Sequence, residues 1–424
     1  MKNRFFLAFA IIVVVAFAGF LYMAWPYRGL VPNIVPVPTA VPSPTPSSTA
    51  GVVQGSNTTG LPLKLPEGFS MNVFAKGLVN PRVLQFDPFG DLTVSIPSEG
   101  KIASLPDADE NGVADKTVGV LDKLSRPHGF LFYSNAANNR KYLAVAEAEK
   151  LMIYGFGSDS KLQPVAYDGQ KAFDLPSSGR HWTKTLLRLN ESSAEELDPP
   201  ILVSIGSSCD VCHESDPRRG AIYSFDPFAE KKELVPYAKG LRNSVFLVKG
   251  PDENVWATEM GRDFLGDELP PDEINIIEKD KNYGWPVCYG KNIHDTQFDK
   301  NTYIRNPCME PLETQSKIDL PAHSAPLGLA FIPAGRGWPE EYEGNLLVAF
   351  HGSWNRSEPT GYKVRRFVLD ANGDVVNDED FISGWLDDKG VLGRPVDLKF
   401  DNNGTLFISD DRSGVIYRVT PPKQ

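Results

Sequence analysis

Imidazole, guanidinium and amide side chains recur along the chain beside short apolar, strand-like runs. They are Arg82, His128, His181, Arg242, Asn243, His323, His351 and Arg394. An imidazole titrates near neutral pH and can serve as a general base, whereas a guanidinium binds carboxylates through paired hydrogen bonds. A surface or core role explains any one of these residues best. Their recurrence at comparable places points instead to a shared functional site.

The strand-like runs themselves form a repeat. They begin near residues 91, 142, 201, 254, 345 and 404, each behind a turn signal, so the steps are about 51, 59, 53, 91 and 59 residues. About 60 residues suffice for a four-stranded blade with its loops. No ten-residue stretch keeps a helical period. The sequence therefore predicts an all-β, six-bladed propeller over residues 62–424, with an insertion in the fourth step and a β-sandwich as the competing fold.

A propeller explains why candidate site residues are scattered along the chain. The inner strands of all blades direct loops toward one central channel, so residues far apart in sequence meet there. Composition limits what binds there: 43 Lys and Arg against 54 Asp and Glu give a net charge of −11. That acidic balance argues against a nucleic-acid partner.

The N-terminus carries a membrane or export signal. Lys2 and Arg4 precede an uncharged run from Phe5 to Trp25, about 21 residues and long enough to span a bilayer. We expect a signal anchor over residues 1–27, with a cleaved signal peptide as the alternative. A Pro/Ser/Thr-rich linker over residues 28–61 follows. These features place the remainder on the extracytoplasmic face of the membrane, or in the periplasm or medium after cleavage.

The four cysteines are then expected to form disulfides. An oxidising compartment favours the local pairs Cys209–Cys212 and Cys288–Cys308. Cys209 to His213 also fits the C-x-x-C-H pattern of covalent haem attachment. The pattern lies in a loop between two strand-like runs, with little apolar sequence to bury a porphyrin, so disulfides are the preferred interpretation.

A short acidic segment has the spacing of a calcium loop. Its oxygen ligands would be Asp107, Asp109, Asn111 and Asp115, with Gly112 at the sharp turn. Val118 occupies the twelfth position, where an EF-hand has Glu, and helices are not expected on either side. A structural calcium loop and a solvated acidic turn both remain open.

Several longer motifs resemble a known family. They are Gly240-Leu-Arg-Asn, Val255-Trp-Ala-Thr-Glu-Met-Gly-Arg-Asp, Pro271-Asp-Glu-Ile-Asn-Ile-Ile, Asn282-Tyr-Gly-Trp-Pro, Gly179-Arg-His-Trp-Thr, Phe350-His-Gly-Ser-Trp-Asn-Arg and Gly393-Arg-Pro-Val-Asp. Together with the Cys209–Cys212 segment, they are similar to the soluble quinoprotein sugar dehydrogenases, and most of all to the glucose/sorbosone dehydrogenase branch. The resemblance covers roughly residues 65–420 and implies a six-bladed propeller that uses pyrroloquinoline quinone (PQQ) and calcium.

The resemblance also assigns roles. His181 matches the base that takes the proton of a sugar C1 hydroxyl while hydride passes to the quinone. Arg242, Asn243 and Arg394 match quinone-binding residues, and Gly261 and Arg262 match the backbone carbonyls that hold the catalytic calcium. Arg82, His128 and His351 are further candidates for the cofactor, as His323 is for the substrate.

Departures from the family pattern leave questions about this site. Met260 stands where Gln is expected, and Arg180 stands where an acidic partner of the base is expected. Asp272 is therefore a candidate to orient His181 or contact substrate. The family's cofactor lysine has no clear counterpart, and His351 or Arg356 is a candidate to replace it.

We expect a dehydrogenase that oxidises an aldose or sorbosone-type sugar and passes electrons to an unidentified acceptor. A calcium-dependent propeller lactonase, in which the ion polarises a carbonyl, is one alternative. A non-catalytic carbohydrate-binding propeller is the other, because the same fold serves many functions.

Overall fold

The computed structural model describes residues 55–135, 139–156, 162–164, 173–189, 200–229 and 231–423. The predicted anchor, residues 1–27, and most of the predicted linker lie outside the described residues. The described parts contain strands and two 3₁₀ turns, Pro97–Glu99 and Glu340–Tyr342, and no α-helix. No helix long and apolar enough to cross a membrane is found among them.

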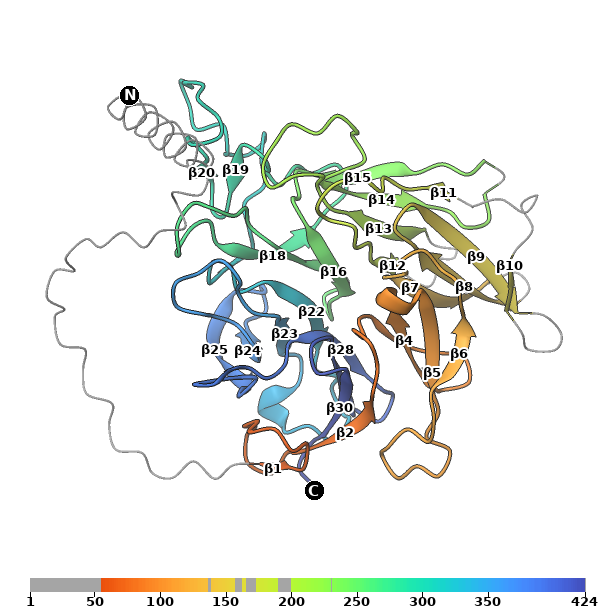
Figure 1. Cartoon of the computed structure of the whole chain (residues 1–424). Helices are drawn as coiled ribbons and strands as arrows, with labels where there is room; N and C mark the ends of the chain where they lie inside the picture. The colour runs from red at the N-terminus through yellow and green to blue at the C-terminus, as the bar shows by residue number, and fades with distance from the viewer. Residues whose placement is uncertain are drawn as a thin grey trace, which may run out of the picture. The chain divides into compact units, whose positions relative to one another are not determined.

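The strands form six main sheets that follow one another along the chain (Figure 1). The first contains β3 (Leu84–Phe86), β4 (Leu92–Ile96), β5 (Lys101–Leu105) and β6 (Val118–Leu121). The second contains β7 (Phe130–Ser134), β8 (Lys141–Ala146), β9 (Lys150–Phe156), β10 (Leu162–Pro164) and β11 (Phe173–Asp174). The third contains β12 (Leu186–Arg188), β13 (Ile201–Ile205), β14 (Ala221–Phe225) and β15 (Val235–Lys239).

In the other three sheets, the four main strands are again antiparallel. The fourth contains β16 (Ser244–Lys249), β17 (Val255–Glu259), β18 (Asp272–Ile277) and β21 (Ile318–Leu320). The fifth contains β22 (Pro326–Phe331), β23 (Leu346–Phe350), β24 (Lys363–Leu369) and β25 (Val375–Ile382). The sixth joins β28 (Pro395–Phe400), β29 (Leu406–Asp410) and β30 (Val415–Thr420) to β2 (Ser70–Lys76) and β1 (Ser56–Asn57). Two small hairpins complete the list, β19 (Cys288–Tyr289) with β20 (Ile293–His294) and β26 (Leu386–Asp387) with β27 (Gly390–Val391).

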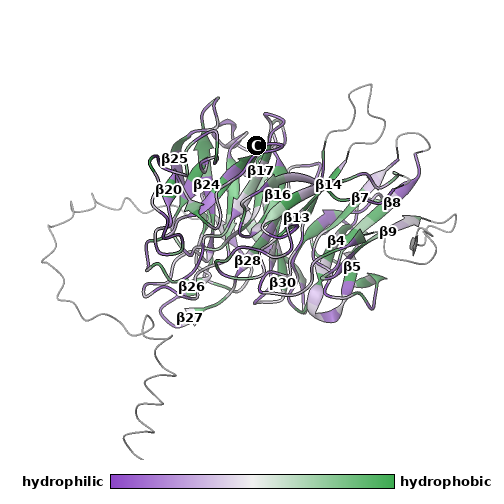
Figure 2. Cartoon of the chain, turned by 90° about the horizontal axis from the view of Figure 1, so that it is seen from above, coloured by the Kyte–Doolittle hydropathy of each residue, from purple (hydrophilic) through white to green (hydrophobic). Residues whose placement is uncertain are grey.

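The first strand of each sheet contacts the first strands of two other sheets, so that β3, β7, β12, β16, β22 and β28 close a ring. This is the predicted six-bladed propeller, and the β-sandwich alternative is wrong. The six repeats read from the sequence are the second strands β4, β8, β13, β17, β23 and β29. They recur so clearly because each is almost wholly buried and mostly apolar. In Figure 2 the apolar colouring follows the strands, and the polar colouring follows the loops between them.

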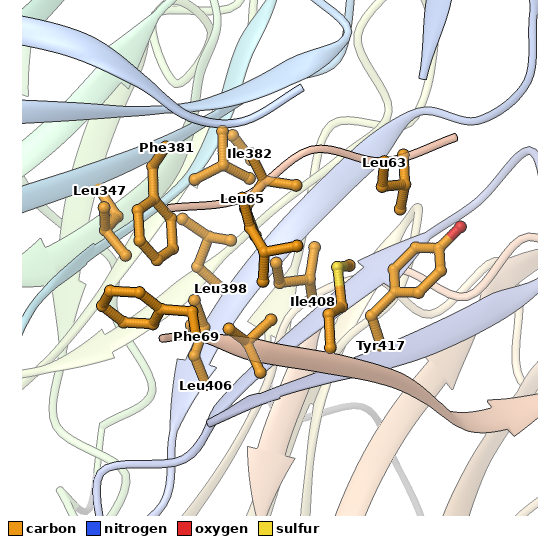
Figure 3. Close-up of a cluster of buried hydrophobic side chains, with 14 of the residues drawn as sticks. Leu63, Leu65, Phe69, Leu347, Phe381, Ile382, Leu398, Leu406, Ile408 and Tyr417 are labelled. Carbon is orange, nitrogen blue, oxygen red and sulfur yellow. The ribbon is translucent and has the colours of Figure 1, made fainter. Parts of the chain in front are cut away.

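The sixth sheet is built from both ends of the domain, since β2 pairs antiparallel with β30. Figure 3 shows the core beneath this closure, where Phe69, at the start of β2, lies among side chains of the fifth and sixth sheets. The parallel pair β1–β2 places Ser56 and Asn57 in the same sheet. The predicted linker boundary at residue 61 is therefore too late, because residues from 55 onward hydrogen-bond to the propeller.

The long fourth step is the predicted insertion. It adds the β19–β20 hairpin and the segment before β21, and a Cys288–Cys308 disulfide closes it. Cys209 and Cys212 form the second disulfide. Both predicted pairings are confirmed, and covalent haem at Cys209 and Cys212 is ruled out, because haem attachment needs free thiols.

Ring closure predicts which aromatic side chains matter for stability. Phe69 is 1% exposed, and its ring centroid lies 5.0 Å from that of Trp338 and 5.3 Å from that of Phe381. Phe69→Ala should lower the free energy of unfolding by about 3–5 kcal/mol, because it removes a buried aromatic and leaves a cavity. Phe89→Ala is the matched control, since Phe89 is 62% exposed and should change stability by about 0.5 kcal/mol or less. Urea unfolding of both variants checks this, and equal midpoints would contradict the role of Phe69.

Candidate active site

One end of the propeller gathers residues from two places in each sheet. The first two strands of a sheet are antiparallel, so the residues entering the first strand lie beside those leaving the second. Arg82, His128, His181, Arg242, His323 and Arg394 are the predicted residues at the entries. The exits contribute Ser207, Met260, His351 and Asp411. These entries and exits form the candidate site.

A cavity of about 240 Å³ lies among the loops of the third, fourth and fifth sheets. Its lining includes six residues predicted from the sequence: His181, Arg242, Asn243, Gly261, Asp272 and His323. Arg180, Met260, Asp263, Ala325, Trp354 and Asn355 complete it. Arg82, His128, His351 and Arg394 do not line this cavity.

The His181 ring is held by a single residue. Its Nδ1 lies 3.0 Å from the Ser207 carbonyl oxygen and 2.9 Å from the Ser207 hydroxyl. The hydroxyl donates its proton to the Cys209 carbonyl at 2.6 Å, so it can only accept from the ring. A carbonyl also only accepts, so Nδ1 carries the proton. Nε2 is therefore the basic nitrogen, and no described residue hydrogen-bonds to it.

Burial lowers the pKa of His181 to about 3, and the nearby Arg242 and Arg180 guanidinium groups act in the same direction. Both effects disfavour the positive imidazolium. The ring is neutral at pH 7 and can accept a proton at Nε2.

Arg242 is fixed from three sides. Its side chain is only 6% exposed. Nε donates to the Asp210 carbonyl at 2.9 Å, Nη1 to the Met260 carbonyl at 3.2 Å, and Nη2 to Asp210 Oδ1 at 2.7 Å. A guanidinium has five N–H groups, so two make no hydrogen bond within the protein, and Nη2, which carries one of them, also pairs with Asp263 at 3.5 Å.

Asp263 connects the two arginines at the cavity. Its Oδ2 lies 3.1 Å from Arg180 Nη2 and 3.5 Å from Arg242 Nη2, and Asn355 donates to its Oδ1 at 2.8 Å. Burial raises the pKa of Asp263 against the opposing effect of Arg242. Arg180, which stands in place of the expected acid, therefore forms an ion pair within the site.

Asp272 does not orient His181, so that part of the prediction is wrong, and its predicted role as a substrate contact stays a prediction. Its carboxylate accepts from the Gly261 and Ala325 backbone N–H groups at 2.9 and 2.8 Å, and from the Ser324 hydroxyl at 3.2 Å. Burial raises its pKa to about 6 despite these bonds. Through these hydrogen bonds the carboxylate connects the loops of the fourth and fifth sheets. The residue that orients the base is Ser207. At the same edge of the cavity, His323 Nε2 donates to the Gly266 carbonyl at 2.8 Å.

Asn243 and His181 approach each other over Gly206. A Cβ added at Gly206 would lie 2.6 Å from Asn243 Oδ1 and 2.7 Å from His181 Cβ. Below them, Glu259 accepts from the Asn243 N–H at 2.7 Å and from the Ser244 hydroxyl at 2.5 Å. Burial raises the pKa of Glu259 to about 8. A glycine at the end of β13 is thus required for the two side chains to meet.

The remaining predicted residues form a second cluster, around Asp411. Arg82 Nη1 lies 2.7 Å from Asp411 Oδ2, and His351 Nε2 lies 2.9 Å from Asp411 Oδ1. Arg394 Nη1 lies 3.3 Å from His351 Nδ1. Although burial acts in the opposite direction, hydrogen bonds from His351 and Arg82 hold the pKa of Asp411 below its usual range. This cluster is paired internally, and its predicted role in cofactor binding stays a prediction.

His128 is buried next to Lys184. Its Nδ1 lies 3.1 Å from the Lys184 carbonyl, so Nδ1 carries the proton, and no described residue hydrogen-bonds to Nε2. Burial lowers its pKa well below the usual range. His128 is therefore neutral and buried, and its predicted role in cofactor binding stays a prediction.

The predicted metal positions differ in character. Arg262 Nη1 pairs with Asp295 at 2.8 Å, and no described donor reaches the carbonyl oxygen of Gly261 or Arg262. In the other loop, Asp107 accepts from the Asn111 and Gly112 N–H groups, and Asp115 accepts from the Ala108 N–H. Within the described ranges the metal-like cluster of His, Cys, Asp or Glu groups is Cys209, Cys212 and Glu214, whose cysteines are already in a disulfide. Calcium at Asp107, Asp109, Asn111 and Asp115 stays a prediction.

No motif or spacing in the sequence identified Ser207, Asp210, Asp263 and Asp411 as site residues. All four follow second strands. Ser207 and Asp210 follow β13, Asp263 follows β17, and Asp411 directly follows β29. Ser207 and Asp411 follow closely on second strands, beside the residues that precede the first strands, so their place in the repeat was a usable signal. Asp210 and Asp263 required knowledge of the loop conformations.

The neutral state of His181 can be tested directly. The imidazole Cε1 NMR signal that disappears in His181→Gln should stay at its neutral position as the pH falls from 8 to 5. The reason is that burial and Arg242 lower its pKa to about 3, whereas a free histidine would gain its proton near 6.5. A midpoint near 6.5 for this signal would show that the ring is solvated and not held as described.

Comparison with known proteins agrees with this fold. Residues 63–422 match the TrAA12-like family. An uncharacterized protein of Borreliella burgdorferi is 39% identical over 371 residues, covering 84% of this chain and 90% of the relative. Two solved structures of Trichoderma reesei Carbohydrate-Active Enzymes Family AA12, an iodide and a calcium structure, each superpose with a TM-score of 0.69 at 20% identity. The iodide structure covers 85% of this chain and 98% of its own, and the calcium structure covers 86% and 99%. The holo pyranose dehydrogenase PQQ domain of Coprinopsis cinerea gives 0.66 at 18% identity, over 86% of this chain and all of that domain. The match across nearly the whole propeller shows that this chain belongs to the TrAA12-like family.

Proposed function

We propose that this protein is a quinoprotein dehydrogenase that oxidises a sugar at C1. The observation that carries the proposal is the pair formed by His181 and Arg242. A neutral imidazole with its basic nitrogen free lines the same cavity as a buried guanidinium with two unused N–H groups. The structural neighbours named for PQQ or for AA12 support the same assignment.

The base step belongs to His181. The C1 hydroxyl of an aldose is a weak acid, so its C–H hydride leaves readily only when a base begins to remove the O–H proton. Nε2 accepts that proton, and the Nδ1–H bond to Ser207 keeps the ring in the required tautomer. The sugar loses one proton and one hydride in total and becomes a lactone.

The part of the site that would hold the hydride acceptor fits an anionic planar group. PQQ, when bound, takes up the hydride. Arg242 offers it two N–H donors from a fixed plane, and Asn243 stands beside them above Gly206. A guanidinium is suited to a carboxylate or a reduced quinone oxygen because its charge strengthens the hydrogen bond. Arg394 stays a candidate for a further carboxylate of the cofactor.

Calcium fits the backbone between Arg242 and Asp272. The carbonyls of Gly261 and Arg262 are hard oxygen ligands of the kind that Ca²⁺ prefers. Asp272 fixes this turn by accepting the Gly261 N–H. A carbonyl ligand does not depend on its side chain, so Arg262 can supply one while its guanidinium pairs with Asp295.

The cavity mouth supplies a surface for the sugar. Trp354 is 62% exposed and meets the exposed Phe264 edge to face, with ring centroids 6.2 Å apart. Such rings offer apolar faces next to the polar groups of Asn355 and Asp263. An open mouth of this kind suits a sugar at the end of a larger molecule as well as a free aldose.

We further propose that the domain works outside the cytoplasm, tethered by its N-terminal apolar segment or released after cleavage. The two disulfides support export, because such bonds persist in oxidising compartments. The electron acceptor is then a small quinone or a cytochrome on the same side of the membrane.

The reaction predicts dependence on both cofactors and on His181. Purified protein should reduce a redox dye with an aldose only when Ca²⁺ and PQQ are both present. His181→Ala should lower turnover by about 10²–10⁴-fold, the usual contribution of a general base, while quinone affinity stays nearly unchanged. His213→Ala is the control, since this exposed histidine lies outside the cavity. Activity that survives chelation and quinone omission would contradict the proposal. If no sugar is oxidised with both cofactors present, a lactonase or a binding role is favoured instead.

The acceptor site predicts a specific loss for Arg242. Arg242→Ala should weaken PQQ binding by about 2–4 kcal/mol, because it removes one partner of a buried charged pair. Arg218→Ala is the matched control: Arg218 pairs with Asp216 in the neighbouring loop and is partly exposed. Fluorescence titration with PQQ measures both variants, and equal affinities would remove Arg242 from the cofactor site.

A further inference from the structure

The loop from Ser207 to Cys212 carries partners of both proposed reaction groups. It leaves β13 in the third sheet. Ser207 holds the His181 ring, which belongs to the same sheet. Asp210 holds Arg242, which precedes β16 in the fourth sheet. One short segment therefore fixes the base relative to the guanidinium.

Of the two residues, Asp210 makes the hydrogen bonds that connect this loop to the fourth sheet. Its carbonyl and its Oδ1 accept two of the three protein hydrogen bonds of Arg242, at 2.9 and 2.7 Å. The same Oδ1 accepts the Asp263 N–H at 2.9 Å. Asp210 thus sets the plane of the guanidinium and the position of the loop that begins at Gly261. It touches neither the basic nitrogen of His181 nor the two unused N–H groups.

The disulfide closes this same segment. Cys209 lies between Ser207 and Asp210, and its carbonyl accepts the Ser207 hydroxyl at 2.6 Å. Its bond to Cys212 encloses only Asp210 and Val211. A loop this short constrains the unfolded chain little compared with a long one. The bond therefore acts mainly on the local geometry of Asp210 and Ser207, and less on global stability.

The two disulfides differ in accessibility. Cys288 and Cys308 are buried, whereas Cys209 and Cys212 are partly exposed. A small thiol added to the native protein therefore reaches the Cys209–Cys212 bond first, because exchange requires access to a sulfur. The loop can be opened selectively while the insertion stays closed.

We propose that the Cys209–Cys212 loop is a positioning element of the reaction, with Asp210 as the positioning residue for Arg242, and that reduction of this disulfide lowers turnover. The inference rests on the proposed function. In the reduction, dithiothreitol supplies two electrons and two protons. The S–S bond becomes two protein thiols, and the reagent becomes its cyclic disulfide.

Substitutions at Asp210 test the hydrogen-bonding role. Asp210→Ala should lower turnover at saturating PQQ on the order of 10²-fold, the scale of a displaced catalytic group. Asp210→Asn should recover most of the loss, because its Oδ1 still accepts from Arg242 and Asp263. Asp216→Ala is the matched control, an acid six residues further on that pairs with Arg218 away from the cavity. Wild-type turnover in Asp210→Ala, or equal losses in the Ala and Asn variants, would overturn this role.

Reduction tests the disulfide without a substitution. Native protein is treated with dithiothreitol and alkylated, and mass spectrometry identifies the modified cysteines. Modification of Cys209 and Cys212 should accompany a fall in turnover on the order of tenfold or more, and reoxidation before alkylation should restore it. Cys209→Ser/Cys212→Ser should be slow from the start and insensitive to the reagent. Full turnover with both thiols alkylated would overturn the proposal.

A readout without cofactor or substrate separates this inference from the proposed function. The Arg242 Nε–H NMR signal of the cofactor-free protein, assigned with Arg242→Lys, should exchange slowly with solvent in the oxidised form and rapidly after reduction. If that signal responds but no sugar is oxidised by wild-type protein, the proposed function fails and the positioning of Arg242 stands. If the signal is unchanged by reduction, the positioning inference fails whatever the activity.

Discussion

A buried guanidinium must have partners, and this requirement organises the site. Arg242 is too far from solvent to keep a charge without compensation, and removing one partner of such a group costs several kcal/mol. Its partners come from the loop after β13, the end of β17 and the loop that begins at Gly261. Three separate segments are therefore fixed around one side chain. His181 and the Gly261 turn take their positions from two of those segments.

The ring of sheets makes this arrangement possible. Each sheet brings the entry of its first strand beside the exit of its second, at the same end. The closed ring then places six such pairs around one channel. Residues as far apart as Arg82 and Asp411 become an ion pair because β2 and β30 share a sheet. Closure of the ring, supported by Phe69 and its aromatic neighbours, is thus a condition for the site.

Much of this was predictable from sequence, for identifiable reasons. The second strands are short, mostly apolar runs behind turn signals, so six repeats and an insertion could be counted. The residues before the first strands, His181 and Arg242 among them, could be found at a constant place in the repeat. Loop conformation could not be read in the same way. Asp272 was predicted to orient the base, but its carboxylate is occupied by backbone N–H groups. The linker boundary was misplaced because Ser56 and Asn57 form a strand through pairing with β2, which their polar sequence does not indicate.

Charge balance at the cavity explains why a divalent cation would accompany an anionic cofactor. Two guanidinium groups, of Arg180 and Arg242, pair with the carboxylates of Asp210 and Asp263, and Asp272 lines the same cavity. Burial raises the pKa of Asp263 and of Asp272, because desolvation disfavours the charged form of each carboxyl group. A tricarboxylate added to this set would meet repulsion that two spare N–H groups of Arg242 cannot offset. An ion on the Gly261 and Arg262 carbonyls would supply two positive charges without displacing any existing bond. If PQQ binds here as proposed, such an ion would offset part of this repulsion.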